Sequence, residues 1–216
     1  MDMGVIGNGS SLKRDLFPEE LIPEILELVI TSWGTFKKPD RLECEVPISK
    51  AFTKIIRAEK NQRDDLPFHV WYELSTLNTQ VEEEGRIDIF FAYIGSPRED
   101  IYFAFECKRL RIPYASGLDT NNSDYVGEQG MLCFVTGKYS EIVTNGGMIG
   151  YVMDGKTEEA IISVGELIKK KSLNLKLAKD TGLETSSIMI DSRNVRETRH
   201  RLSKKYFVIH HIFLAV

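Results

Sequence analysis

The sequence predicts an α/β fold in which helices flank a central mixed β-sheet. Two amphipathic helical segments come first and are followed by three segments rich in β-branched and aromatic residues. Helical and strand-like segments then alternate to the end of the chain. This order favours a mixed sheet flanked by helices, an α/β sandwich, and we expect about five or more strands.

Hydrophobic periodicity and turn residues define the individual elements. Leu21, Ile25 and Leu28 recur at helical spacing in the first segment, and Gly34 ends it. Gly95 and Pro97 are typical of a hairpin loop between the second and third strands. The predicted helices are 16–33, 48–61, 125–139 and 157–170, and the predicted strands are 68–77, 87–94, 101–110, 148–153, 188–191 and 206–216.

The composition indicates an ordinary globular protein. With 42% hydrophobic and 28% charged residues, the chain is neither disordered nor collagen-like and can bury one core. We expect a single domain at residues 16–216 behind a flexible lead-in at residues 1–15. Three cysteines without a CxxC pair favour reduced thiols. Without a signal peptide or an apolar run of about 20 residues, a cytoplasmic location is expected.

Ionisable residues interrupt two of the apolar strands. Asp88 lies in the predicted strand 87–94, while Glu106 and Lys108 lie two residues apart in the next. Residues two apart on a strand share a face, and a hairpin would bring Asp88 close to them. A buried salt bridge is the simplest reading of one acid beside one lysine. Two acids against one base leave an excess negative charge, which a metal ion would neutralise.

This set of residue types suits phosphodiester hydrolysis. Carboxylates are hard oxygen ligands for Mg²⁺, for which Mn²⁺ is expected to substitute. A cation neutralises the scissile phosphate and lowers the pKa of water, while a lysine orients the water or stabilises the transition state. The sequence therefore predicts a metal-dependent hydrolytic centre.

Asp88, the hairpin and Glu106-Cys107-Lys108 resemble the D…ExK motif of the PD-(D/E)XK nuclease superfamily. The resemblance covers roughly residues 43–139, although Ile87 stands where the family has proline. It implies a restriction-endonuclease-like three-layer sandwich and metal-dependent hydrolysis of nucleic acid, with DNA preferred. Restriction, repair and phage defence are the biological roles expected by this analogy.

The resemblance also implies roles for individual residues. It makes Asp88, Glu106 and the Cys107 backbone carbonyl metal ligands, and it makes Lys108 the residue that positions the attacking water. Gln129 loosely matches a glutamine that approaches the lysine or the substrate in some family members.

An acid from an earlier helix completes the family's site. Glu45 matches its position best, with Glu43 as an alternative. Either glutamate could instead be an exposed acid near the start of a helix, where it interacts favourably with the helix dipole. Glu73 is a further candidate, although a cross-strand charge pair explains it more simply.

Basic residues are expected to hold the nucleic-acid backbone despite the net charge of −4. Phosphate binding depends on where charges cluster, although solvated surface charge is the ordinary explanation for each cluster. A homodimer would bring two sites to the two strands of a duplex. The predicted contacts are Arg109, Arg111, Lys138, Arg196 and Arg199.

A non-catalytic subunit is the main alternative function. Such a subunit would keep the fold and use the acidic site structurally, binding nucleic acid or protein. The presence of Asp88, Glu106 and Lys108 together favours the nuclease, because a site that no longer catalyses has no chemical reason to keep all three.

Overall fold

A computed structural model describes residues 17–63, 65–76, 85–96, 98, 100–139, 143–178, 182–203 and 205–216. The predicted lead-in, the first residue of the first predicted helix and Pro97 of the predicted hairpin loop lie outside these ranges.

A mixed sheet of seven strands forms the centre of the described chain, in the order β1-β2-β3-β6-β9-β8-β7. β1, β2 and β3 pair antiparallel, β6 joins β3 and β9 in parallel, and β8 and β7 continue antiparallel. The prediction of a mixed central sheet is confirmed. The strands are β1 (Phe68–Thr76), β2 (Gly85–Tyr93), β3 (Tyr102–Leu110), β6 (Asn145–Val152), β7 (Glu184–Thr185), β8 (Val195–Arg201) and β9 (Tyr206–Ala215).

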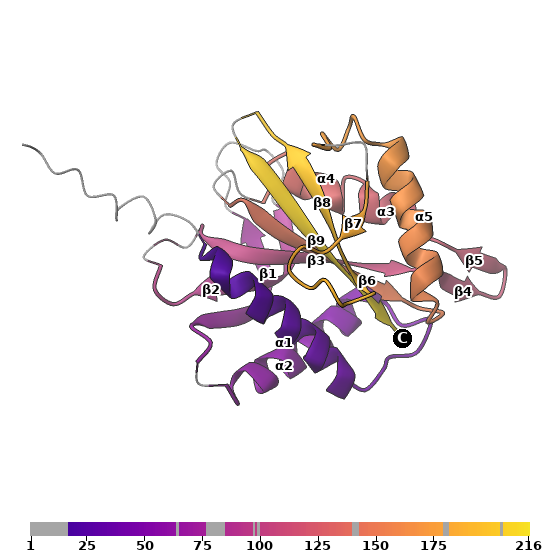
Figure 1. Cartoon of the computed structure of the whole chain (residues 1–216). Coiled ribbons are helices and arrows are strands. Elements are labelled where there is room, and N and C mark those ends of the chain that lie inside the picture. The colour runs from indigo at the N-terminus through magenta and orange to yellow at the C-terminus, as the bar shows by residue number, and fades with distance from the viewer. Residues whose placement is uncertain are drawn as a thin grey trace, which may run out of the picture.

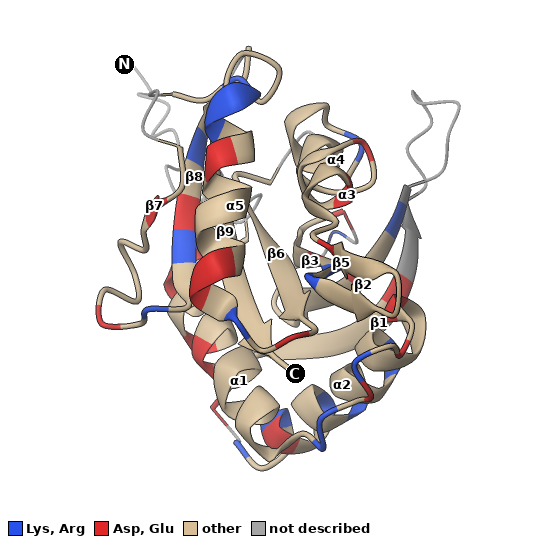
Figure 2. Cartoon of the chain, turned by 90° about the vertical axis from the view of Figure 1, so that its right-hand side faces the viewer, with Lys and Arg blue, Asp and Glu red and all other residues tan. Residues whose placement is uncertain are grey.

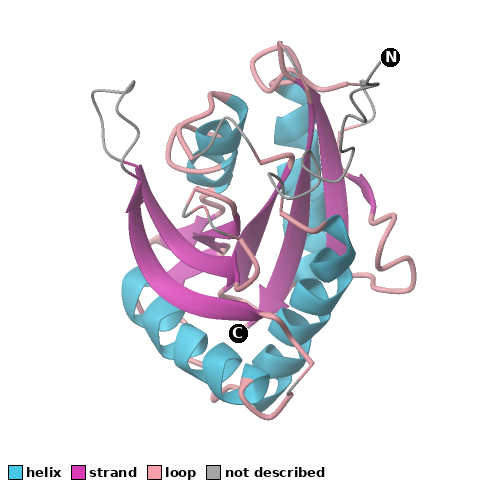
Figure 3. Cartoon of the chain, turned by 90° about the vertical axis from the view of Figure 1, so that its left-hand side faces the viewer, coloured by secondary structure: helices cyan, strands magenta, loops and turns pink. Residues whose placement is uncertain are grey.

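Helices cover both faces of this sheet (Figures 1 and 3). A short 3-10 turn, η2, precedes the two helices of one face, and three helices lie on the other. No helix in the described part of the chain combines the length and apolar character needed to span a membrane. The helical elements are η2 (Glu19–Leu21), α1 (Ile22–Thr35), α2 (Glu45–Lys60), α3 (Asn122–Val126), α4 (Met131–Val135) and α5 (Thr157–Lys170).

Alternation along the strands divides the interior into two cores. Phe103 and Phe105 of β3 pack with α1 and α2, whereas Tyr102 and Ala104 pack with the helices of the other face. Since side chains alternate between faces, Glu106 falls on the same face as Ala104. Glu106 and Lys108 therefore lie on the face covered by the helices that follow β3, and Lys108 also reaches Glu45 at the start of α2.

Three predicted helices have different limits in the structure. In place of the predicted helix 16–33, the 3-10 turn η2 is followed by α1, which begins at Ile22 and ends at Thr35. α2 begins at Glu45, before the predicted residue 48, because Cys44 is the last extended residue and Pro47 is tolerated in a first helical turn. The predicted helix 125–139 is divided into α3 and α4. Gly130 lies at the division, where a Cβ would come within 2.1 Å of the Tyr125 carbonyl oxygen.

The strands near the C-terminus also differ from the prediction. β8 was not predicted, and residues 188–191 form a bend and turn. There the Ser186 hydroxyl accepts hydrogen bonds from the amides of Ile188 and Met189, at 3.3 and 3.0 Å. Such side-chain bonds compete with strand pairing. A small hairpin of β4 (Ile112–Tyr114) and β5 (Gly117–Asp119) was likewise not predicted.

Candidate active site

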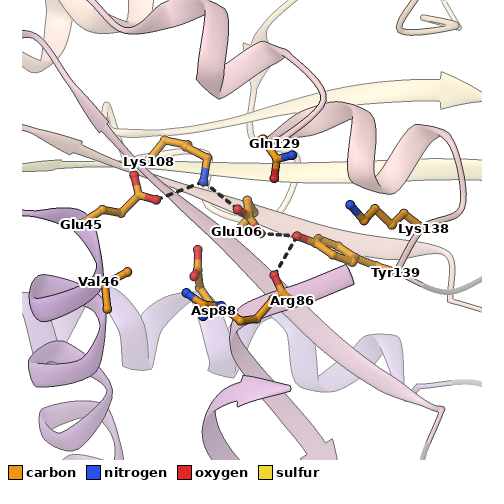
Figure 4. Close-up of a pocket in the computed structure, with 9 residues that line it drawn as sticks. All are labelled: Glu45, Val46, Arg86, Asp88, Glu106, Lys108, Gln129, Lys138 and Tyr139. Carbon is orange, nitrogen blue, oxygen red and sulfur yellow. Dashed lines mark hydrogen bonds and ion pairs between the residues drawn. The ribbon is translucent and has the colours of Figure 1, made fainter. Parts of the chain in front are cut away.

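The candidate site lies where β2 and β3 stop pairing. Their register runs from Ala92–Tyr102 to Ile89–Phe105 and ends just before Asp88 and Glu106. A cavity of about 460 Å³ opens at this point (Figure 4). Its lining consists of Glu45, Val46, Arg86, Asp88, Glu106, Lys108, Gln129, Lys138 and Tyr139.

Carboxylate side chains accept hydrogen bonds from the backbone amides of β3 beyond the point where β2 stops pairing with it. The Cys107 amide donates to Asp88 Oδ2 at 2.8 Å, and the Arg109 amide donates to Glu45 Oε2 at 3.0 Å. Buried backbone groups need such partners when a strand ends. The divergence of the strands therefore fixes two carboxylates at one point, one from β2 and one from the first turn of α2.

Lys108 joins the acids into one network. Its ammonium donates to Glu106 Oε1 at 2.7 Å, to Glu45 Oε1 at 3.0 Å and to the Cys107 carbonyl at 3.0 Å. Glu106 and Lys108 are 5% and 8% exposed, as is expected of charges that share partners. The structure thus brings together Asp88, Glu106, Lys108 and Glu45, the four residues at the centre of the sequence prediction.

Tyr139 is a site residue that the sequence prediction missed. Its hydroxyl contacts Glu106 Oε2 and lies 3.1 Å from the Arg86 carbonyl oxygen, so its proton has two acceptors. Glu106 is held on both oxygens, by Tyr139 on one and by Lys108 on the other (Figure 4). The only signal in the sequence is an aromatic residue beside Lys138 at the end of the predicted helix, which does not reveal a contact with β3.

The electrostatics of the site reflect an excess of acids. Burial raises the pKa of Asp88 to about 6, against the lowering effect of Lys108 and of the Cys107 amide. Burial and then the charge of Asp88 raise the pKa of Glu106 to about 7. Burial alone would lower the pKa of Lys108, but the charges of Glu106, Glu45 and Asp88 outweigh it and raise that pKa. One ammonium therefore faces three carboxyl groups.

We expect the metal-free protein to lose stability as the pH rises from 4 to 8. Asp88 and Glu106 have folded-state pKa values above those of the unfolded chain. In this pH window the folded state therefore binds more protons than the unfolded state. The free energy of unfolding falls as the pH rises toward the folded pKa values. The loss should be on the order of a few kcal/mol. Urea unfolding in EDTA at several pH values measures it.

A matched variant isolates this effect. Asp88→Asn/Glu106→Gln removes both titrations, so its stability should change much less between pH 4 and pH 8. An equally steep decline in the variant would show that other groups cause the pH dependence.

The donor set fits a divalent cation. Asp88, Glu106, Glu45 and the Cys107 carbonyl offer the hard oxygen atoms that Mg²⁺ prefers. In the described residues no three Asp, Glu, His or Cys side chains are arranged as a metal-binding group. Lys108 lies between Glu45 and Glu106, so a cation would have to draw these carboxylates toward Asp88.

The other predicted acids do not line the cavity, whereas Gln129 does. The Glu43 carboxylate accepts a hydrogen bond from the neighbouring Cys44 amide at 3.0 Å. Glu73 lies on β1 between the residues that pair with Ile89 and Ile87, has a positive φ of 56° and forms an ion pair with Arg86 at 3.3 Å. Among the three candidates for the third acid, the structure brings only Glu45 to the site.

The predicted phosphate contacts are scattered. Lys138 lines the cavity, and Arg109 lies beside it, with its guanidinium donating to the Glu43 carbonyl at 3.1 Å. Arg111 is turned away and buried in ion pairs with Asp154 and Glu159.

The last two predicted contacts, Arg196 and Arg199, belong to β8. Figure 2 shows this strand across the sheet from β1 and β2. Arg196 donates to the Val195 carbonyl at 2.9 Å, and Arg199 pairs with Glu197 at 2.7 Å. Neither residue lines the cavity.

The described site is a water-accessible cluster of three carboxyl groups around one lysine, capped by a tyrosine and bordered by two further cations, Arg86 and Lys138. It draws on α2, β2, β3 and the segment around α4, which are distant in sequence. The chain matches no family model, no curated protein and no solved structure.

Proposed function

We propose that this protein is a metal-dependent nuclease that hydrolyses phosphodiester bonds, with DNA as the preferred substrate. The observation that carries the proposal is the convergence of Glu45, Asp88 and Glu106 on Lys108 in one open cavity. We further propose the restriction-endonuclease-like fold and membership of the PD-(D/E)XK superfamily. The motif resemblance and the mixed sheet with helices on both faces support both assignments.

Asp88, Glu106 and the Cys107 carbonyl would hold the cation, with Glu45 as a further carboxylate. A bound Mg²⁺ would neutralise charge on the scissile phosphate and lower the pKa of water. The cation also accounts for the excess of acids, because two positive charges balance the two carboxylates that Lys108 leaves over. Asp88 fits this role, since only Oδ2 is used in its hydrogen bond to Cys107 among the described residues.

The protein's own groups would position the reactants. The Lys108 ammonium would hold the attacking water and donate a hydrogen bond as charge develops on the phosphate. Tyr139 would keep Glu106 from rotating, because it contacts the carboxylate oxygen that Lys108 does not hold. Arg86 and Lys138 at the rim would hold phosphate oxygens of the bound strand.

One observation favours a non-catalytic subunit as the second candidate. The Lys108 ammonium already has three oxygen partners, so part of the network is satisfied without any ligand. In such a subunit the network would simply join α2 to β3. The two candidates differ in whether a metal binds and whether any substrate is cut.

We expect the purified protein to cleave nucleic acid in Mg²⁺ or Mn²⁺ and not in EDTA. Supercoiled plasmid, linear duplex, single-stranded DNA and RNA are incubated with each metal, and the products are separated on gels. Calorimetry with Mg²⁺ alone measures metal binding without a substrate. Glu43→Gln serves as a matched control for Glu45→Gln, since both acids precede or begin α2 but only Glu45 lines the cavity.

Cleavage that needs metal and Glu45, but not Glu43, would support the nuclease. No metal binding and no cleavage of any of the four substrates would overturn it and favour the non-catalytic subunit.

A further inference from the structure

An exposed aromatic side chain lies on β1, the strand that pairs with β2 of the cavity. Trp71 is 44% exposed and pairs in register with Phe90, which lies two residues from Asp88 on β2. Two residues along a strand correspond to about 7 Å. Opposed residues of paired strands share a face, so Trp71 stands on the same side of the sheet as Asp88.

Two neighbours hold the Trp71 ring in place. The Arg57 guanidinium of α2 lies over the ring, 5.4 Å from its centroid, and the His69 ring meets it edge-on at 6.1 Å. A side chain that is already ordered loses little entropy when a ligand stacks on it. Its exposure leaves part of the ring open to such a ligand.

One exposed side of α2 connects this ring with the cavity. Val46, Lys50 and Arg57 lie four and seven residues apart, so they share this side of the helix, and two of the three are basic. Val46 lines the cavity, while Arg57 covers Trp71. The stripe thus leads from the acidic centre to the aromatic ring and carries the charge that suits a polyanion.

We propose that Trp71 and Arg57 form a stacking platform for an unpaired base of single-stranded DNA whose backbone crosses the cavity. This inference rests on the proposed nuclease function and adds the form of its substrate. Proteins that bind single strands combine a basic track with aromatic rings on which bases stack. In a duplex the bases are already stacked in pairs, so the platform would be of no use.

The chain provides a matched control for the platform. Tyr206 is 61% exposed and has the Arg201 guanidinium 5.6 Å from its ring centroid, which repeats the chemistry of Trp71 and Arg57. It lies at the start of β9 and does not line the cavity. An effect of general aromatic exposure would appear at both rings, whereas an effect of the platform would appear only at Trp71.

The test measures binding of labelled single-stranded DNA by fluorescence anisotropy, with Ca²⁺ in place of Mg²⁺ and with gels to show that the DNA stays intact. Trp71→Ala is expected to raise Kd roughly 5- to 150-fold. Trp71→Phe should lose less, because it retains an aromatic face. Arg57→Gln should weaken binding and flatten its salt dependence. Tyr206→Ala should bind as the wild type does.

Intrinsic fluorescence gives a second measurement that does not depend on affinity. The chain has two tryptophans, and Trp33 is only 6% exposed and packs against Phe52. Quenching by single-stranded DNA is therefore expected from Trp71 and should vanish in Trp71→Phe. Duplex DNA should quench little.

Equal affinities of Trp71→Ala and Tyr206→Ala would overturn the platform, and so would quenching that is as strong with duplex DNA. Tighter Trp71-dependent binding of single-stranded RNA would overturn the choice of DNA. Cleavage with Mg²⁺ but without a Trp71 effect would remove the platform alone. Trp71-dependent binding without cleavage under any metal would instead remove the nuclease proposal.

Discussion

Replacing Lys108 with methionine is expected to lower the rate of phosphodiester cleavage by about 10²- to 10³-fold. Methionine keeps an unbranched side chain but removes the ammonium that contacts Glu45, Glu106 and the Cys107 carbonyl. The attacking water would lose the group that positions it. Glu45 and Glu106 would lose the ammonium that donates hydrogen bonds to both of them. Single-turnover cleavage with saturating Mg²⁺ measures the change.

A loss of folding must be separated from this loss of chemistry. Removing one partner of a buried pair leaves the other charge uncompensated and destabilises the protein. In Lys108→Met/Glu106→Gln the charge of Glu106 is removed too, so part of the lost stability should return while activity does not. Lys170→Met, an exposed lysine at the end of α5, should be active and stable. Wild-type rates in folded Lys108→Met would contradict the proposed role of the lysine.

Arg111→Met is expected to lower the free energy of unfolding by about 3–5 kcal/mol. The side chain of Arg111 is 7% exposed and pairs at 2.9 Å with Asp154, which is 12% exposed. Glu159 is 53% exposed, so solvent screens it and it contributes less. For a chain of this size, the melting temperature should fall by roughly 6–20 °C. Calorimetry and urea unfolding measure both quantities.

Lys156 provides the control for Arg111. It is 60% exposed and also pairs with Glu159, but only on the surface. Lys156→Met should therefore change stability by less than about 0.5 kcal/mol. If instead Arg111→Met were as stable as the wild type and bound DNA less tightly, Arg111 would be a phosphate contact after all.

The common face of Glu106 and Lys108 was predictable because side chains alternate strictly along β3. Glu106 and Lys108 interrupt an otherwise apolar strand two residues apart, and this alone predicts a common face and a partner. Tyr139 could not be found in this way, since its contact with Glu106 depends on how the segment after α4 folds back on β3. The ion pairs of Arg111 with Asp154 and Glu159 could not be predicted either, because charge in a sequence does not reveal which acids lie nearby in the fold.

The elements were predictable where local signals and tertiary packing agree. The limits of α5 were predicted to the residue. Its apolar face packs against the sheet, and its acidic first turn and basic last turn mark the two ends of the helix. β8 contains three arginines and a histidine, and it is a strand because β9 supplies its pairing along its whole length. The opposite case is residues 188–191, whose β-branched and apolar composition is overruled by the hydroxyl of Ser186.

The hydrogen bond from the Arg109 amide to Glu45 makes the site depend on α2 remaining docked. Asp88, Glu106 and Lys108 belong to neighbouring strands and stay together, whereas Glu45 leaves whenever the first turn of α2 lifts. When it does, the Arg109 amide loses its acceptor and exchanges its hydrogen with solvent. The exchange rate at this one backbone position thus reports the fraction of molecules in which the third acid is in place.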